Sequence, residues 1–390
     1  MTARVGRHFL QIPGPSSAPD AVLHAMARQT MDHRGPEFGV FAKTLLADLR
    51  KVFRTERPVI MYPSSGTGAW EAALVNLFQP GDVVLMAETG QFATLWRELA
   101  ERLDIKAEFI PGDWRRGVDP GAVAARLKAD IKGEIRAVCM VHNETSTGAT
   151  SRVHDVRKAI DATVHEALLL VDTISGLGSM PYEHDAWGVD VTVAGSQKGL
   201  MTPPGLSFNA VSEKALAVAR AGGMRRSYWD WQAMLELNAT GYFPYTPATN
   251  LLYGLRAAVD QILAEGLEAA WARHRRLADA ARHATQAWGL EIQCEVPEER
   301  SNVLTAVRLP DGHDADALRA AILKNFDVSL GNGLGKIKGK VFRIGHLGDV
   351  NEPLLMGTLA AVEMGLKLAG VPHQSGGVDA AMRRLVETAG

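Results

Sequence analysis

The stretch that decides the fold is VTVAGSQKGLMTPPGLSF, residues 191–208. Val191 and Val193 are β-branched and apolar, as in a buried strand. Small residues follow them and leave room beside the backbone, and a Pro-Pro-Gly bend ends the turn. Lys198 stands between these features, where a strand delivers a side chain to the mouth of an α/β sheet. Such a lysine is a candidate covalent nucleophile, with pyridoxal phosphate as its commonest partner; the alternative is a surface lysine beside a turn.

Composition indicates a globular protein of two domains. The chain has 390 residues, of which 46% are apolar and 22% charged, and its net charge of −2 does not suggest a nucleic-acid surface. We expect no secretory signal, no membrane span and no peroxisomal address, because the sequence has no long apolar run and ends ETAG. Cys139 and Cys294 lack metal-ligand spacing and fit a reducing compartment. These features predict a cytoplasmic protein without a metal.

Short apolar segments alternate with helical patterns through the first half of the chain. Strands are predicted over 83–87, 106–110, 136–141 and 167–171, with helices over 92–103, 120–129 and 153–165. This alternation is typical of a mostly parallel sheet with helices on both faces. Ligands bind beyond the carboxyl ends of the strands in such folds.

Small and hydroxylated residues from Ser64 to Gly68 lead into an amphipathic helix that ends before Pro80. The free N–H groups at the start of a helix suit an oxyanion such as phosphate, although a plain capped helix has the same pattern. The sequence has neither GxxxxGK[ST] nor GxGxxG, so it predicts no P-loop and no dinucleotide fingerprint.

Two charged residues stand in apolar strands and need partners. Asp172 follows ALLLV, 26 residues before Lys198, so both residues can reach one crevice. It is interpreted as the partner of a protonated pyridine nitrogen, or else as a helix cap. Arg343, in VFRIG, is interpreted as a clamp for a ligand carboxylate, with an internal salt bridge as the alternative.

The two ends of the chain differ from its middle. Residues 9–19 predict an extended arm, and residues 211–240 are expected to be helical. From about residue 289 the pattern predicts a smaller α+β domain that begins with a strand over about 289–295. The predicted divisions are an N-terminal arm over 1–20, a large cofactor domain over 21–265 and a small domain over 266–390.

Five motifs in one order resemble a known family, and the resemblance runs from HFLQIPGP to about Gly377. They are SSGTGAWEAALVN, HNETSTG, VDTISGLGS, GSQKG with PPG, and KVFRIGHLG. The sequence resembles the serine–glyoxylate aminotransferases, in the alanine–glyoxylate branch of the fold-type-I pyridoxal-phosphate enzymes. This resemblance implies a large domain with a mostly parallel seven-stranded sheet and a smaller α+β C-terminal domain. It also implies a homodimer with its active site at the subunit boundary.

The resemblance also implies roles for individual residues. Lys198 looks like the Schiff-base lysine and Asp172 like the pyridine-nitrogen partner. The residues that resemble cofactor contacts are Ser65, Gly66, Thr67 and Gln197 around the phosphate, Phe92 against the ring, Thr145 at the ring oxygen, Ile174, and Thr246 with Tyr242 or Tyr245 from the neighbouring subunit. The residues that resemble substrate contacts are Arg343 and the backbone at Gly14. Phe92 stands where the alanine–glyoxylate relative has tryptophan, and Phe243 stands where it has a tyrosine.

The expected reaction is a transamination from serine to glyoxylate. Aspartate or alanine as donor is the nearest alternative. Arg34 is a candidate second cation for aspartate, or else a surface arginine, and His346 is a candidate polar contact for serine. A desulfurase-like lyase needs a mobile catalytic cysteine, which neither cysteine resembles. The missing GxGxxG argues against a nicotinamide enzyme, and the set of Lys198, Asp172 and Arg343 argues against a cofactor-free binding protein.

Overall fold

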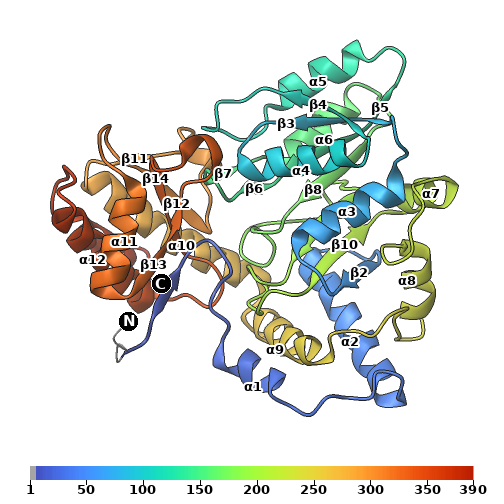
Figure 1. Ribbon diagram of the computed structural model, residues 1–390, viewed down its shortest axis with the longest axis horizontal. Coiled ribbons are helices and arrows are strands. Elements are labelled where there is room, and N and C mark those ends of the chain that lie inside the picture. Colours follow the sequence, from blue (N-terminus) through green and yellow to red (C-terminus); the bar gives the residue numbers. More distant parts are fainter. Residues whose placement is uncertain (1–5, 390) are drawn as a thin grey trace.

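A seven-stranded sheet organises the larger unit of the chain (Figure 1). The computed structural model describes residues 6–389. From one edge to the other, the strands are β2 (Val59–Tyr62), β10 (Ser207–Val211), β9 (Val191–Gly195), β8 (Leu168–Asp172), β5 (Ile135–Val141), β3 (Val83–Ala87) and β4 (Lys106–Ile110). The last five are parallel, and β10 is antiparallel to both of its neighbours. The prediction of a mostly parallel seven-stranded sheet is confirmed.

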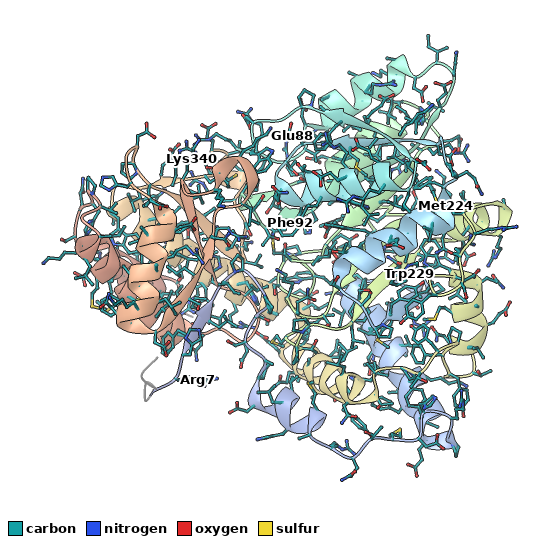
Figure 2. The ribbon with its side chains drawn as sticks, in the orientation of Figure 1. Arg7, Glu88, Phe92, Met224, Trp229 and Lys340 are labelled. Carbon is teal, nitrogen blue, oxygen red and sulfur yellow. The ribbon has the colours of Figure 1, made fainter. Side chains whose placement is uncertain are left out.

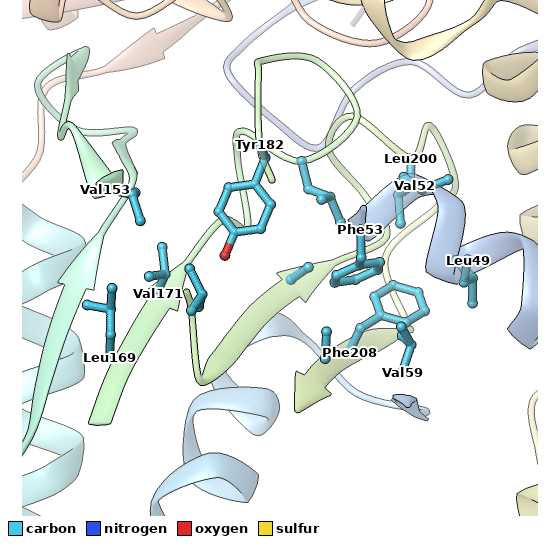
Figure 3. Close-up of a cluster of buried hydrophobic side chains, with 14 of the residues drawn as sticks. Leu49, Val52, Phe53, Val59, Val153, Leu169, Val171, Tyr182, Leu200 and Phe208 are labelled. Carbon is cyan, nitrogen blue, oxygen red and sulfur yellow. The ribbon is translucent and has the colours of Figure 1, made fainter. Parts of the chain in front are cut away.

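Helices cover both faces of this sheet because its central strands are apolar on both sides. One face carries α2 (Pro36–Phe53), α5 (Pro120–Ala129), α6 (Val153–Asp161) and α9 (Thr249–Glu265). The other face carries α3 (Gly66–Leu77), α4 (Gln91–Arg102), α7 (Glu213–Ala221) and α8 (Trp231–Asn238). Along β8, Leu169 and Val171 join the first core, in which Phe53 packs edge-on against Phe208 (Figure 3). Parallel pairing of the last five strands brings their carboxyl ends to one edge of the sheet.

A five-stranded sheet organises the smaller unit (Figure 1). Its strand order is β1 (Phe9–Gln11), β13 (Val328–Asn332), β14 (Val341–Gly345), β12 (Leu304–Arg308) and β11 (Glu291–Ile292). Its helices are α10 (Leu267–Ala287), α11 (Ala315–Phe326), α12 (Glu352–Leu368) and α13 (Gly377–Glu387). The remaining elements are α1 (Asp20–Met26), β6 (Asn143–Glu144), β7 (Ala149–Thr150), η1 (Pro297–Glu299) and η2 (Gly335–Ile337). The α+β composition predicted for this part of the chain is confirmed.

The N-terminal arm belongs to both units. Strand β1 pairs in parallel with β13, so the arm completes the sheet of the smaller unit. The predicted arm over 1–20 therefore contains a strand, and its residues 1–5 lie outside the described residues. The predicted division after residue 265 falls at Gly266, which separates α9 from α10.

Local elements differ from the sequence expectation in three places. Residues 222–230 are not helical, because Gly222 ends α7 and Asp230 begins α8 by accepting bonds from the N–H groups of Gln232 and Ala233. The strand expected over 289–295 shortens to β11. Helix α13 was not predicted, and it packs along α10. Within residues 6–389, no helix is long and apolar enough to cross a membrane.

Candidate active site

A cavity of about 130 Å³ lies at the carboxyl-terminal edge of the seven-stranded sheet. Strands β5, β8 and β9 end beside it, and the first turn of α3 forms part of its wall. The lining residues are Ser65, Gly66, Thr67, Trp70, Phe92, Val141, Asn143, Thr145, Asp172, Ile174, Gln197 and Lys198. A wider surface hollow of about 810 Å³ beside Arg273 contains none of these residues. The small cavity is therefore where the sequence motifs meet, as expected for ligand sites in parallel sheets.

Lys198 follows β9 and places its amine in the cavity wall. The residue is 8% exposed, and its Nζ donates to the carbonyl oxygen of Pro13 at 2.7 Å. Burial and, to a smaller extent, the nearby Arg343 lower the pKa of Lys198 to about 8, with Asp172 opposing the change. A lowered pKa leaves more of the amine neutral near pH 7, which is the form that attacks a carbonyl group.

Asp172 is the last residue of β8, and both of its carboxylate oxygens accept hydrogen bonds. The N–H of Ile174 donates to Oδ1 at 2.7 Å, and the indole Nε1 of Trp70 donates to Oδ2 at 3.1 Å. Burial raises the pKa of Asp172 to about 7, and the nearby Glu144 adds to the rise. A cationic ring nitrogen in the cavity would supply the missing opposite charge.

The loop that opens α3 leaves a helix N-terminus facing the cavity. Ser65 is the N-cap residue, but its side chain caps no N–H group. A Cβ atom on Gly66 would overlap the side chain of Ile174, so the backbone approaches the cavity closely only with glycine there. Gln197 contributes a buried Oε1 that has no hydrogen-bond partner among residues 6–389. Free N–H groups and hydroxyl groups suit a phosphate group, and the Gln197 Oε1 can accept a hydrogen bond from a donor group of a ligand.

The HNETSTG motif forms the opposite wall and holds the start of α4. Glu144 is fully buried and accepts bonds from the backbone N–H groups of Phe92 and Ala93 and from the backbone and hydroxyl of Ser146. Phe92 thereby lines the cavity, on the side of the larger unit that faces the smaller unit (Figure 2). Thr145, the next residue along the motif, also lines the cavity.

Arg343 reaches the same region from β14 of the smaller unit. Its Nε donates to the carbonyl oxygen of Asn332 and one terminal nitrogen to that of Thr145, both at 2.7 Å. The side chain is 6% exposed, and burial lowers the pKa of Arg343 to about 10. Its hydrogen bonds go to carbonyl groups, and within residues 6–389 it does not form the salt bridge weighed as the alternative. The guanidinium retains capacity for an anion.

The N-terminal arm passes directly over Lys198. Gly14 has a φ of 102°, and a Cβ atom on it would overlap the lysine side chain. Two bonds fix the next part of the arm: the N–H of Ser16 donates to the Gln197 carbonyl, and its hydroxyl donates to the Lys198 carbonyl at 2.8 Å. The arm thus connects the smaller sheet with the lysine.

Two candidate substrate residues lie outside this cavity. Arg34 is exposed, in the loop before α2. His346 is fully buried in the smaller unit, where Nε2 bonds to the hydroxyl of Thr305 and Nδ1 to the carbonyl of Asn302. Both ring nitrogens of His346 are engaged, so this chain does not bring His346 to a substrate, and it fits the packing role of a buried histidine.

The predicted cross-subunit contacts lie on the loop before α9. Thr246 is exposed, and the Tyr242 hydroxyl lies 3.4 Å from the carbonyl oxygen of Gly35. Tyr245 is held more firmly, because its hydroxyl donates to the Met61 carbonyl at 2.6 Å and its ring stacks on Tyr228. The Tyr242 hydroxyl therefore makes the longer of the two hydrogen bonds, while the Tyr242 ring stacks on Phe38.

Both cysteines are buried and lie outside the cavity lining. Cys139 stands within β5, and burial raises its thiol pKa. Burial also raises the pKa of Cys294, to about 11. Neither residue has the exposed, low-pKa thiol that a desulfurase-like reaction needs.

Three contributors to the site did not emerge from the sequence. Trp70 lies in the quoted GTGAW segment but reads as one apolar position of a helix, and its bond to Asp172 depends on the neighbouring strand. Glu144 belongs to the HNETSTG motif. Its position in an otherwise buried segment could have indicated a carboxylate that needs several hydrogen-bond donors. Pro13 acts through its backbone carbonyl, which no side-chain pattern reveals.

The arrangement fits pyridoxal phosphate at each part of that molecule. The lysine suits its carbonyl carbon, Asp172 its ring nitrogen, Phe92 the face of its ring, and the α3 N-terminus its phosphate. The unpaired Gln197 Oε1 and the close approach at Gly66 show a wall shaped for a ligand. Fold and site together define a fold-type-I pyridoxal-phosphate enzyme. The chain belongs to the class-V aminotransferase family, which it matches over residues 8–339.

Similar sequences extend over almost the whole chain. It is 46% identical to the serine–glyoxylate aminotransferase of Methylorubrum extorquens, covering 99% of this chain and 98% of the relative. It is 44% identical to the serine–glyoxylate aminotransferase of Arabidopsis thaliana, covering 96% and 94%. It is also 42% identical to the L-aspartate–glyoxylate aminotransferase of Paracoccus denitrificans, covering 97% and 96%.

Solved structures agree with this family. The pyridoxamine–pyruvate aminotransferase of Mesorhizobium loti superposes with a TM-score of 0.92 at 30% identity, covering 99% of both chains. The alanine–glyoxylate aminotransferase of Nostoc sp. superposes with a TM-score of 0.86 at 32% identity, covering 94% of this chain and 97% of the other. The protein is an aminotransferase that uses pyridoxal phosphate and acts on small molecules.

Proposed function

We propose that the enzyme transfers the amino group of serine to glyoxylate, giving hydroxypyruvate and glycine. The observation that carries this proposal is a small cavity in which Lys198 is the one cationic lining residue, with Arg343 beside it. One guanidinium serves the single carboxylate of serine or glyoxylate, whereas aspartate needs a second cation. The extensive identity to serine–glyoxylate aminotransferases supports the same donor and acceptor.

In the proposed mechanism, the residues of this chain bind, orient and move protons. When bound, pyridoxal phosphate supplies an electron sink for the charge that develops at the substrate α-carbon. Lys198 holds the cofactor, and its free Nζ moves the proton at the α-carbon as general base and acid. Asp172 holds the proton on the ring nitrogen. Arg343 binds each substrate carboxylate in turn and so orients the α-carbon.

We assign the remaining cavity residues to cofactor binding. Phe92 and Ile174 would contact the ring, and Thr145 its oxygen substituent. The phosphate ligands would be Ser65, Gly66, Thr67 and Gln197. The support is their shared position on one cavity wall. The backbone at Gly14 would cover the substrate, because the arm already lies over the lysine.

Aspartate is the alternative donor, and two observations favour it. A relative with 42% identity is an L-aspartate–glyoxylate aminotransferase. Arg34 is exposed and would be available as a second cation if a neighbouring subunit placed it at the cavity. Alanine remains a third candidate on size alone.

The experiment is a comparison of kcat/KM for serine, alanine and aspartate at saturating glyoxylate, in the wild type and in Arg34→Ala. Serine is expected to lead in the wild type and to be unaffected by the substitution. If aspartate leads and its activity collapses in Arg34→Ala, the serine assignment is wrong while the transaminase assignment stands.

We also propose a homodimer with the active site at the subunit boundary, in a cytoplasmic enzyme. Support for the dimer comes from one loop that carries the exposed Thr246 and Tyr242, whose hydroxyl makes a single long hydrogen bond within its own chain. We assign both residues as contacts to the phosphate bound by a second subunit. Two unpaired cysteines fit a reducing compartment. Sedimentation of the cofactor-loaded enzyme at dilute concentration tests the dimer, and an active monomer would contradict it.

A further inference from the structure

Trp70, in the first half of α3, donates a hydrogen bond from its indole to the carboxylate of Asp172. Its indole is 2% exposed and stacks on Trp96 of α4, with ring centroids 5.8 Å apart and an interplanar angle of 9°. Two packed rings leave the indole little freedom to turn. The Nε1–H group therefore points at Oδ2 of Asp172 from a fixed direction, at 3.1 Å.

This bond decides how Asp172 presents its lone pairs. The N–H of Ile174 holds Oδ1, and Trp70 holds Oδ2, so the plane of the carboxylate is set at two points. Without the indole the N–H of Ile174 would hold the carboxylate at one point, and its plane would be less constrained. Each carboxylate oxygen accepts more than one bond, so a lone pair remains for a ligand in the cavity.

We propose that Trp70 is a positioning residue for cofactor binding, which fixes the Asp172 carboxylate in the orientation and charge state that receive the ring nitrogen. The inference rests on the role proposed above for Asp172. Trp70 acts through that carboxylate, and donating to its Oδ2 stabilises the ionised form. A phenylalanine in its place would lose the donor together with part of the ring packing on Trp96.

The chain supplies a matched control in the same stacked pair. Trp96 is 1% exposed, and its Nε1 has no hydrogen-bond partner among residues 6–389. Trp96→Phe therefore removes an indole of equal size from the same contact without removing a bond to a carboxylate. Any effect of packing alone should appear in both variants.

The first measurement uses the cofactor-free protein labelled with ¹³C at the aspartate carboxyl group. Burial holds the pKa of Asp172 near 7, and the Trp70 bond lowers it. Glu144 raises and Lys198 lowers the pKa of Asp172, and Asp172 in turn raises the pKa of Tyr182. In Trp70→Phe the ionisation constant of Asp172 is expected to fall about tenfold, while Trp96→Phe leaves it at the wild-type value. Asp172→Asn identifies the resonance.

The second measurement is the dissociation constant for pyridoxal phosphate, obtained by equilibrium titration of the same proteins. Weakening by roughly tenfold in Trp70→Phe, but not in Trp96→Phe, is the expected result. Equal behaviour of the two variants in both measurements would overturn the inference. If Asp172→Asn binds cofactor and turns over like the wild type, the role of Asp172 fails instead.

A third measurement covers the case in which Trp70→Phe does not fold. The sequence contains eight tryptophans, whose indole N–H groups can be observed by ¹⁵N labelling of the wild-type protein. One indole resonance is expected to follow the titration of Asp172 and to lose that dependence in Asp172→Asn. If no indole resonance follows this titration, Trp70 does not donate to the carboxylate and the inference is refuted.

Discussion

Replacing Asp172 with asparagine should stabilise the cofactor-free protein increasingly as pH rises, while removing most of its activity. Burial raises the pKa of Asp172 from its ordinary value of 3.8 to about 7. Because the pKa of Asp172 is higher in the folded than in the unfolded state, the stability that Asp172 contributes is fully present below pH 4 and is lost as pH rises through 7. The full loss corresponds to roughly 4 kcal/mol. Asparagine does not ionise and avoids this loss.

The substitution also has a cost that does not depend on pH. The N–H of Ile174 and the indole of Trp70 both donate to Asp172, and an asparagine side chain has one acceptor oxygen. One buried donor is left unmatched, which costs about 1–3 kcal/mol. The variant should therefore be close to the wild type near pH 5 and more stable by about 1–3 kcal/mol near pH 8.

Urea unfolding of the two cofactor-free proteins at pH 5 and pH 8 tests this expectation, at one protein concentration because assembly contributes to stability. Asp190→Asn is the control, since Asp190 is a buried carboxylate that accepts bonds from Leu169 and Ser212 outside the cavity lining. A difference between wild type and Asp172→Asn that stays constant with pH would refute the reasoning. The loaded variant should lose a hundredfold or more in kcat, because a neutral amide does not hold a pyridinium.

Other substitutions test the remaining parts of the site. Lys198→Ala should abolish turnover, and borohydride treatment of the loaded wild type should fix the cofactor on the peptide containing Lys198; label on another lysine would contradict the assignment. The rate at which the cofactor attaches to the apoenzyme should rise with pH through about 8, where Lys198 becomes neutral, and then level off; a rise continuing toward pH 10.5 would contradict the lowered pKa. Glu144→Ala should destabilise the protein by about 1–3 kcal/mol in urea unfolding, because the N–H groups of Phe92 and Ala93 lose their acceptor, with Glu144→Gln retaining part of the stability.

The sheet was predictable because local patterns match the way its strands are buried. Strand β3 was predicted with the bounds it has, since an apolar run over 83–87 is enclosed on both faces. The pairing of β1 with β13 was not predictable, because three residues of an arm carry no periodic signal and their partner lies more than 300 positions away. Helix α13 has an amphipathic pattern that becomes informative only once α10 offers a surface to pack on.

The site residues likewise include some that the sequence predicts and some that it does not. Lys198, Asp172 and Thr145 each follow a recognisable strand, so the topology alone brings them to one sheet edge. His346 also follows a strand, but β14 belongs to the smaller unit and turns this side chain into its core. The position of a residue after a strand therefore predicts a site only when the sheet that contains the strand is known.

The charged groups around the cavity share one electrostatic property. Burial moves the pKa of Lys198 and Arg343 downward and that of Asp172 upward, so each group is pushed toward its neutral form. Burying these charged groups without partners lowers the stability of the empty protein. A ligand that brings an anionic phosphate and carboxylate together with a cationic ring nitrogen supplies the opposite charges and offsets that loss. Cofactor binding should therefore raise thermal stability in proportion to the logarithm of cofactor concentration. The same burial that destabilises the empty cleft makes Lys198 nucleophilic, so stability and activity oppose one another at this residue.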